Sequence, residues 1–538
     1  MIYFDCYAAL GRKAGKDPLA PWTTEQMLAD MQRCRIHGAL VYAHQARETH
    51  PEVGNPIISE ICRENERLYP CWVTLPHQMG EVLPPKQFLL EMEKQDVRAL
   101  KIFPREFWHP VEETTLGELL GLLQETQTLL IVDRGEYGDY VQIDWEEIDW
   151  ICKSYPRLPL LLHSVRWEAT RRLAPLLERR QNIHLEFSNY QGNRMLEFWT
   201  ERIGVERLLF GTEAMEKCHG AARAYVDYAD LTEAQKRAVA GENLMRLLKI
   251  ETPPPAYPES DSDDLILKKA LAGQPIDDMT VVDGHAHIVQ KGGRGASRVA
   301  MNQADAEGVV KRNRALGVNK TCVSAWTAIW GDYKLGNEDT IEAMKDFPGE
   351  ILGYAALDPN YVTDWASECE YYYEKHGFVG MKPYHPRMQR PYNDPLYEPW
   401  WAYGNDHHLI ALMHPSDNFF AEMVDLATRF PNVQFLLAHS GWTWKIARDH
   451  VELGKRFPNC FLEITFTAVL NGVIEYLVRE VGSQRVVYGS DAPMRDPFPQ
   501  FGWVAYADIS EEEKRDVFGR NMEKILATVE RHAKKKGS

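Results

Sequence analysis

The stretch Thr280-Val-Val-Asp-Gly-His-Ala-His-Ile-Val289 decides the fold prediction. Its β-branched residues predict a strand, and side chains alternate between the two faces of a strand, so His285 and His287 point the same way. Two imidazoles on one side of a strand can hold one metal ion. Two histidines at a strand end can equally be structural, so the metal prediction depends on what the later strand ends supply.

Short apolar runs, separated by longer amphipathic stretches, follow this first strand. The expected strands are Gly317–Val323, Ile351–Ala355, Leu409–Met413, Val433–Leu437, Cys460–Ile464 and Arg485–Tyr488. Apolar runs that alternate with helices predict parallel strands, and eight such units close into a β/α barrel. In such barrels the chemistry collects at the carboxyl ends of the strands.

The chain contains this pattern twice. The segments Tyr228–Arg237 and Tyr506–Arg515 read alike and lie 278 positions apart, and the same offset relates Asp5 to Asp283. Repetition at the length of a domain indicates a duplication rather than a solenoid. The fold class is therefore predicted as α/β, with two tandem TIM-like (β/α)8 barrels.

The total length agrees with this prediction, because 538 residues fit two barrels of roughly 250 residues each. Residues 251–264 combine four prolines with an acidic cluster, which is typical of a semi-rigid linker, and a short helix is expected at Leu265–Ala272. We expect a first barrel at 1–250, the linker with its helix at 251–278, and a second barrel at 279–538.

The composition is that of an ordinary globular protein, with 44% hydrophobic and 26% charged residues. A formal net charge of -17 argues against nucleic acid or an anionic membrane as a partner. The chain has no apolar run of membrane-spanning length and begins without a signal peptide, so a cytoplasmic location is expected. The nine cysteines contain no Cys-x-x-Cys pair and suggest neither a disulfide framework nor a zinc finger. Self-association as a homo-oligomer stays open.

The carboxyl ends of the predicted strands in the second half carry the residues that could do chemistry. In strand order they are His285 and His287, Lys382, His414, His439 and Asp491. Imidazole nitrogens with one carboxylate suit zinc or a similar divalent ion, and a coordination position left for water makes such a site catalytic.

The motifs around these residues resemble the metal-dependent amidohydrolase superfamily, specifically the amidohydrolase-2 branch that includes aminocarboxymuconate-semialdehyde-type decarboxylases. They are Val282-Asp-Gly-His-Ala-His287, Gly380-Met-Lys-Pro383, Met413-His-Pro415, Ala438-His-Ser-Gly441 and Gly489-Ser-Asp-Ala-Pro493. The resemblance implies that His285, His287, His414 and Asp491 hold one divalent ion, with zinc expected first and manganese as the alternative. It also implies that His439 is an acid/base residue and that Lys382 supports the site.

The same residues fit more than one reaction. A bound divalent ion activates water and polarises a carbonyl, Asp491 or His439 can take the proton of the water, and His439 can pass it to a leaving group. The leading hypothesis is a hydrolase acting on an amide, lactone or related bond. A non-oxidative decarboxylase of the same branch is the alternative, and a non-catalytic metal-binding protein is the third possibility.

Two features point to a small substrate that bears a carboxylate. The glycine-rich, basic loop Gln290–Arg298 suits a mobile lid in which Arg294 and Arg298 meet a carboxylate, although a solvated loop would have the same composition. Aromatic residues near the strand ends suit a planar or cyclic substrate, although most large aromatics belong to cores. The candidate substrate-binding residues are Lys382, Tyr384, Trp326, Trp442, Arg294 and Arg298.

The first half lacks most of this set. The repeat places Tyr7 and Ala9 at the positions of His285 and His287, Asp133 at that of His414, and Glu213 at that of Asp491. Matching Leu160-Leu-Leu-His-Ser164 to Leu436-Leu-Ala-His-Ser440 leaves Lys101 and His163 as retained residues. Alanine cannot bind a metal, so the first barrel is predicted to be degenerate and the chain to bind one ion.

Overall fold

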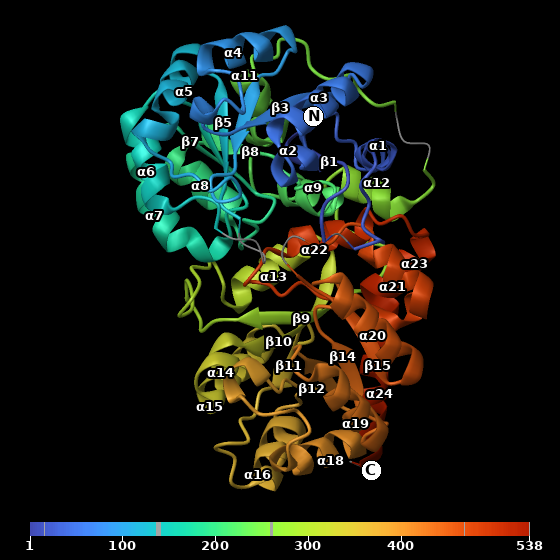
Figure 1. The fold of residues 1–538 in the computed structure, drawn as a ribbon. Coiled ribbons are helices and arrows are strands. Elements are labelled where there is room, and N and C mark those ends of the chain that lie inside the picture. Colours follow the sequence, from blue (N-terminus) through green and yellow to red (C-terminus); the bar gives the residue numbers. More distant parts are fainter. Residues whose placement is uncertain (16, 136–140, 259–261, 467–468, 537–538) are drawn as a thin grey trace. The chain divides into compact units, whose positions relative to one another are not determined.

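A computed structural model describes residues 1–15, 17–135, 141–258, 262–466 and 469–536. The chain divides into two compact units, residues 1–261 and 262–538, and in each unit helices surround a set of parallel strands (Figure 1). Residues 259–261 of the predicted linker lie outside the described residues.

The first unit contains eight parallel strands that pair in sequence order. They are Phe4–Leu10 (β1), Gly38–Ala43 (β2), Leu68–Thr74 (β3), Ala99–Ile102 (β4), Leu129–Asp133 (β5), Leu160–His163 (β6), Ile183–Glu186 (β7) and Leu208–Leu209 (β8). The α-helices are Thr24–Arg33 (α1), His44–Glu48 (α2), Pro51–Glu64 (α3), Pro85–Lys94 (α4), Glu113–Thr126 (α5), Trp145–Ser154 (α6), Thr170–Arg179 (α7), Met195–Ile203 (α8), His219–Asp227 (α9), Glu233–Arg237 (α10) and Asn243–Leu247 (α11).

The second unit repeats this order with a second set of eight parallel strands. They are Val281–Ile288 (β9), Val318–Ala325 (β10), Ile351–Ala355 (β11), Gly380–Met381 (β12), Ile410–Met413 (β13), Gln434–Leu437 (β14), Cys460–Ile464 (β15) and Val486–Tyr488 (β16). The α-helices are Leu265–Leu271 (α12), Ala306–Arg314 (α13), Trp326–Trp330 (α14), Tyr333–Asp346 (α15), Trp365–Cys369 (α16), His385–Met388 (α17), Glu398–His407 (α18), Phe419–Arg429 (α19), Trp444–Arg456 (α20), Val473–Val481 (α21), Pro497–Ala505 (α22), Glu511–Arg515 (α23) and Asn521–Lys536 (α24).

Backbone hydrogen bonds join the first and last strands of each set. In the first unit the Cys6 amide donates to the Phe210 carbonyl at 2.9 Å. In the second, the Asp491 amide donates to the His285 carbonyl at 2.7 Å. The prediction of two tandem (β/α)8 barrels is confirmed.

Burial explains why the strands read as continuous apolar runs rather than alternating ones. The four residues of β13 are all fully buried, as are Leu129 and Leu130 of β5, because each strand packs against the barrel interior on one face and against helices on the other. Among the described residues, no helix is both long and apolar enough to cross a membrane.

A buried aspartate near the start of each barrel holds the closure in place. Asp283 Oδ1 accepts hydrogen bonds from the amides of Ser490 at 3.0 Å and His285 at 3.1 Å. In the first barrel Asp5 Oδ1 accepts from the amides of Thr212 at 3.0 Å and Tyr7 at 2.9 Å. Each aspartate therefore links the first strand to the turn after the last one, which fixes the two ends that carry site residues.

The proline-rich segment after the first barrel packs on that barrel. The Tyr257 hydroxyl donates to the Ile36 carbonyl at 3.2 Å, and the Arg67 guanidinium lies over the Tyr257 ring at 3.9 Å. The expected short helix is present as α12, and it belongs to the second unit, where Asp264 accepts a hydrogen bond from Lys514.

Candidate metal centre

The strand ends of the second barrel bring the predicted metal ligands and the predicted acid/base residue into one buried group. His285 and His287 lie on β9, His414 directly follows β13, His439 follows β14, and Asp491 follows β16. Four of these five residues are at most 4% exposed, and the fifth, His414, is partly exposed. Lys382 follows β12 and is fully buried.

Each of the four imidazoles is held through its Nδ1 atom. The Nδ1 atoms of three of them lie 2.9 to 3.0 Å from backbone carbonyls: His287 with Ser324, His414 with Pro415 and His439 with Thr465. A carbonyl oxygen only accepts hydrogen bonds, so Nδ1 carries the proton and Nε2 keeps its lone pair. Metal-binding histidines in proteins are oriented in this way.

The Nε2 atoms of the two histidines on β9 lie close to the Asp491 carboxylate. Asp491 Oδ1 lies 3.1 Å from His287 Nε2 and 3.8 Å from His285 Nε2. These three residues form one group whose ligand atoms lie within 4.8 Å of one another, and His285, His439 and Glu463 form a second. The other carboxylate oxygen, Asp491 Oδ2, pairs with Arg495.

Burial favours the neutral imidazoles that bind metals. Burial, followed by the charge of Lys382, lowers the pKa of His287 and His414 to about 3. Burial also lowers the pKa of His439 well below its ordinary value, with His414 and Arg495 adding to the effect. A metal ion needs unprotonated imidazole, so the surroundings preset the ligand form.

The donor set fits a divalent ion. The lone pair on His287 Nε2 and the Asp491 Oδ1 atom face each other at 3.1 Å, and two acceptors at that distance repel unless a cation lies between them. Nitrogen ligands with a carboxylate suit zinc or manganese. His285, His287 and Asp491 would hold the ion, and His414 stays a predicted ligand, since it belongs to neither of the two groups found among the described residues.

The backbone at two of these positions is unusual. His439 has φ 63° and Asp491 has φ 56°, in the left-handed region that side chains other than glycine rarely adopt. Such strained positions persist where surrounding contacts hold them, and they gather at functional sites. Here they turn the two side chains inward at the ends of β14 and β16.

The motifs of this barrel match a family model described as amidohydrolase over residues 282–527. The second barrel belongs to the amidohydrolase family. No curated protein matches the chain.

Several solved structures are similar to one barrel's length of this chain. A TIM-barrel protein of Bordetella bronchiseptica has 16% identity and a TM-score of 0.37, and covers 46% of this chain with 99% of its own. A dihydroxybenzoic acid decarboxylase of Polaromonas sp. JS666, solved with manganese and an inhibitor, has 16% identity and a TM-score of 0.35, with 46% and 97% covered. A 5-carboxyvanillate decarboxylase of Novosphingobium aromaticivorans, also solved with manganese, has 13% identity and a TM-score of 0.37, with 46% and 96% covered.

Glu463 is a site residue of the amidohydrolase barrel that the sequence predictions missed. It lies on β15, is fully buried, and its Oε2 is 3.0 Å from His285 Nδ1. The same oxygen accepts a hydrogen bond from the His439 amide at 3.3 Å. One carboxylate thus orients two candidate chemical residues. A glutamate inside the apolar run Cys460–Ile464 was the only signal that could have revealed it.

Glu463→Gln should weaken metal binding about 10 to 100-fold while the barrel stays folded, because groups that orient ligating histidines typically contribute that much. Competition with a chelator of known affinity measures the change. Glu475→Gln, which alters a glutamate on α21 whose Oε1 accepts from the Asp508 amide, is the control and should leave the affinity unchanged. Equal affinities in all three proteins would reduce Glu463 to a core residue.

Two groups of aromatic rings, named the aromatic walls, lie beside the histidines of the amidohydrolase barrel. In the first, Trp326 and Trp330 stack at 5.1 Å, and Tyr384 lies 5.2 Å from the His414 ring. In the second, Trp442 stacks on Phe466 at 4.7 Å, beside His439. Flat apolar walls around a polar centre suit a planar organic ligand.

The predicted basic residues lie at different depths. Lys382 Nζ is 3.3 Å from His285 Nε2, so this residue contacts a candidate ligand directly. Arg298 is exposed and its guanidinium lies over Trp330 at 5.0 Å, at the aromatic wall. Arg294 is exposed, and the contact described for it is a backbone bond from the Met301 amide. The roles of all three in substrate binding stay predictions.

The corresponding centre of the first barrel is filled by its own side chains. Lys101 Nζ pairs with Asp133 Oδ2 at 2.8 Å, and the Tyr7 hydroxyl donates to Asp133 Oδ2 at 3.0 Å and contacts Ser164 Oγ at 3.0 Å. The described residues of this barrel contain no group of three His, Cys, Asp or Glu residues with ligand atoms close enough for a metal. The ammonium group of Lys101 supplies the positive charge instead.

The predicted equivalence of His163 and His439 is wrong by one residue. Asp133, the counterpart of His414, pairs in register with His163. In the second barrel Met413 pairs with Leu437, so the next residue, His414, lies opposite Ala438 and not opposite His439. Ser164 therefore takes the place of His439, with the same left-handed φ of 56° and the same hydrogen bond from its amide to a glutamate, here Glu186 at 3.1 Å. Of the two residues expected to be retained, Lys101 and His163, only Lys101 occupies the position predicted for it. The equivalence of positions follows from strand register and not from the shared His-Ser sequence.

Tyr7→Phe should destabilise the first barrel by about 1 to 3 kcal/mol, because the buried Asp133 and Ser164 oxygens lose a hydroxyl partner. Denaturant unfolding of the whole chain measures the shift. Tyr42→Phe, which removes a hydroxyl that takes part in neither of these contacts, is the control. No shift with Tyr7→Phe would contradict this account of how the centre is filled.

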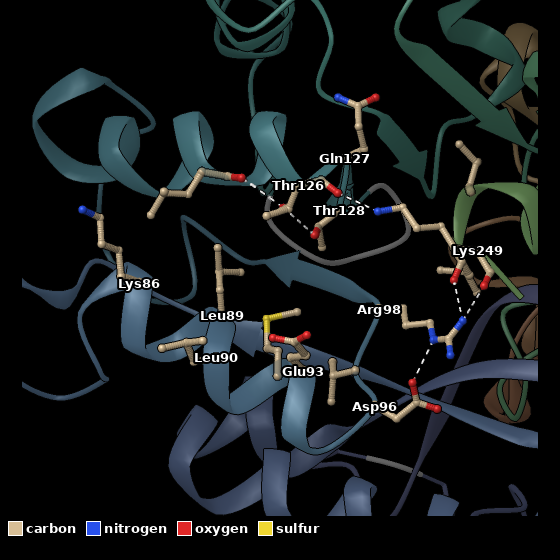
Figure 2. A pocket seen from close by; sticks show the side chains of 15 residues that line it. Lys86, Leu89, Leu90, Glu93, Asp96, Arg98, Thr126, Gln127, Thr128 and Lys249 are labelled. Carbon is tan, nitrogen blue, oxygen red and sulfur yellow. Dashed lines mark hydrogen bonds and ion pairs between the residues drawn. The ribbon is translucent and has the colours of Figure 1, made fainter.

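A groove of about 660 Å³ lies at the opposite end of the first barrel from this centre, at the amino-terminal ends of β4 and β5 (Figure 2). Lys249 Nζ donates to the Thr126 carbonyl at 2.6 Å, and Arg98 donates to the Lys249 carbonyl at 2.6 Å and to Asp96 at 2.8 Å. These bonds tie the end of α11 to the loops before the two strands. That end of a β/α barrel contributes stability rather than chemistry.

Proposed function

We propose that the second barrel is a metal-dependent hydrolase that cleaves an amide, lactone or related bond of a small carboxylate-bearing substrate. The observation that carries this proposal is the anchoring of His439. Its Nδ1 donates to the Thr465 carbonyl, so its Nε2 faces the site as a proton acceptor. Hydrolysis begins by removing a proton from water, which requires such an acceptor.

His285, His287 and Asp491, with His414 as a further candidate, would hold the divalent ion. When bound, that ion polarises a carbonyl and makes water more acidic, lowering its pKa from 15.7 towards about 7. Asp491 Oδ1 lies among the imidazoles and can receive a water proton, while Arg495 holds Oδ2 and fixes the carboxylate plane. His439 Nε2 can accept that proton, from Asp491 or directly from water, and can then deliver the same proton to the leaving group.

The walls would select the substrate. The Trp326–Trp330 stack and the Trp442–Phe466 stack favour a flat molecule between them. The guanidinium groups of Arg298 and Arg387 both lie over Trp330, at 5.0 and 4.8 Å, where a carboxylate at the entrance would find paired donors.

The proposal is tested by incubating the metal-loaded protein with small cyclic and aromatic carboxylates that bear an amide or lactone, in water labelled with heavy oxygen. Incorporation of the label into a product carboxyl group supports hydrolysis. Release of carbon dioxide from the substrate, with no label in the remaining product, identifies decarboxylation.

Decarboxylation is the second candidate, and the Trp442–Phe466 stack beside His439 favours it. A carboxylate placed against these rings would lose its water shell, and desolvation favours the release of neutral carbon dioxide. His439 would then have to start as a donor, protonating the carbon that loses the carboxyl group. The Nδ1 bond to Thr465 leaves Nε2 as an acceptor in the neutral ring, and the lowered pKa of His439 keeps the ring neutral, so both favour the role of base.

A further inference from the structure

The first barrel retains a polar cavity of about 160 Å³ at the carboxyl ends of its strands. Its floor is closed by the Lys101–Asp133 pair and by Tyr7, whose ring stacks on His163 at 4.0 Å. Since the centre already contains a cation and the described residues form no metal-binding group there, the cavity suits an organic ligand rather than an ion.

One wall of this cavity presents hydrogen-bond acceptors without donors. The Asn189 amide nitrogen donates to Glu213 and to Ser188 Oγ, which fixes the orientation of the amide group. Asn189 Oδ1 is therefore an acceptor, and it is buried without a hydrogen-bond partner in a residue that is 2% exposed. Glu216 Oε1 is buried without a partner as well. Unpartnered buried acceptors are costly, so this wall calls for a donor group.

The donor that fits is a primary ammonium group. It offers three N–H donors, and the wall offers Asn189 Oδ1, Glu216 and the Glu213 carboxylate, all of which line the same cavity. The two glutamates also provide the negative charge that a cation needs in a partly buried place.

The rim of the cavity has the opposite charge. Lys13, Arg47 and Lys217 line it, and all three are only partly buried. Lys13 and Lys217 line the same cavity as Glu213 of the acceptor wall. A carboxylate attached to the ammonium group would meet these cations.

We propose that the first barrel binds a small zwitterion of the α-amino acid class, with its ammonium group on Asn189, Glu213 and Glu216 and its carboxylate towards Lys13 and Lys217. A volume of about 160 Å³ equals roughly five water molecules at about 30 Å³ each, which admits an amino acid with a small side chain. Drug-sized ligands need about 300 Å³ or more. The degenerate barrel is thus a binding domain for a different ligand from that of the second barrel.

The test uses isothermal titration of the full chain with L-alanine, and with propionate and ethylamine as analogues that carry only one of the two charges. Saturable binding of alanine, with at least 10-fold weaker binding of either analogue, supports the proposal. Equal binding of one analogue, or no alanine binding up to the highest concentration that calorimetry allows, overturns it.

Variants locate the site. Glu213→Gln should weaken alanine binding about 10-fold or more, because hydrogen bonds to charged groups are among the strong ones. Lys13→Met, at a partly exposed position outside the helices and strands, should weaken alanine binding as well and serves if the first variant fails to fold. Asp491→Asn, at the corresponding position of the second barrel, should leave alanine binding unchanged. Unchanged binding in both first-barrel variants, or loss in Asp491→Asn, places the ligand elsewhere and overturns the assignment.

Discussion

Elemental analysis of the chain purified without chelators should give close to one equivalent of a divalent metal, and the His285→Ala variant should retain almost none. The second barrel brings His285 and His287 together with Asp491, and their ligand atoms lie within 4.8 Å of one another. In the first barrel Tyr7 and Ala9 stand on β1, and Lys101 neutralises Asp133. A site that loses one of its few strong ligands binds transition metals far more weakly.

The control for this measurement is His163→Ala in the first barrel, which should leave the metal content at one equivalent. Its imidazole contacts Lys101 at 3.2 Å and stacks on Tyr7, so it belongs to the filled centre. Two equivalents in the parent chain, both surviving His285→Ala, would show that the first barrel binds metal and would refute its degeneracy.

His439→Ala should keep the metal and lose most of the activity, about 10² to 10⁴-fold, because that is the usual contribution of a positioned proton-transfer group. The measurement is turnover on a substrate found by the labelled-water screen, alongside the metal content of the same preparation. The variant loses the Nδ1 bond to the Thr465 carbonyl, but the backbone amide of residue 439 still donates to Glu463 and holds the loop, so the loss should be mainly chemical.

Two other outcomes would change the role of His439. Loss of the metal would make it a ligand, in keeping with its grouping with His285 and Glu463. Activity within a few-fold of the parent would make it structural. His450→Gln is a matched control, because this buried histidine contacts Ser440 Oγ at 2.9 Å behind the same loop and should alter stability more than turnover.

The sequence predicted the barrels well because their signals are repeated many times. The apolar runs at Ile351–Ala355 and Cys460–Ile464 coincide with β11 and β15, and two buried faces explain their composition. The sequence could predict that His285, His287, His439 and Asp491 lie close together, because each stands at a strand end, where barrel geometry gathers side chains regardless of their distance in the chain.

The misses have a different physical origin. Glu463 lies within an apolar strand and contacts His285, which is far away in the sequence, so no local motif marks it. His163 was matched to His439 by letters, but backbone pairing between β5 and β6 places Ser164 there. The hydroxyl of Tyr7 as the partner of Asp133 depends on side-chain packing across the barrel, which one-dimensional patterns do not contain.

The left-handed turns after β6 and β8 of the first barrel have an evolutionary consequence. Ser164 and Glu213 have φ values of 56° and 55°, close to the 63° of His439 and the 56° of Asp491, although the two positions carry different side chains from their counterparts in the second barrel. The decay of this half replaced side chains and left the supporting backbone in place. A lineage, or a protein engineer, could therefore restore a second metal centre by exchanging a handful of side chains at existing strand ends, with no loop to rebuild, once the Lys101–Asp133 pair is removed.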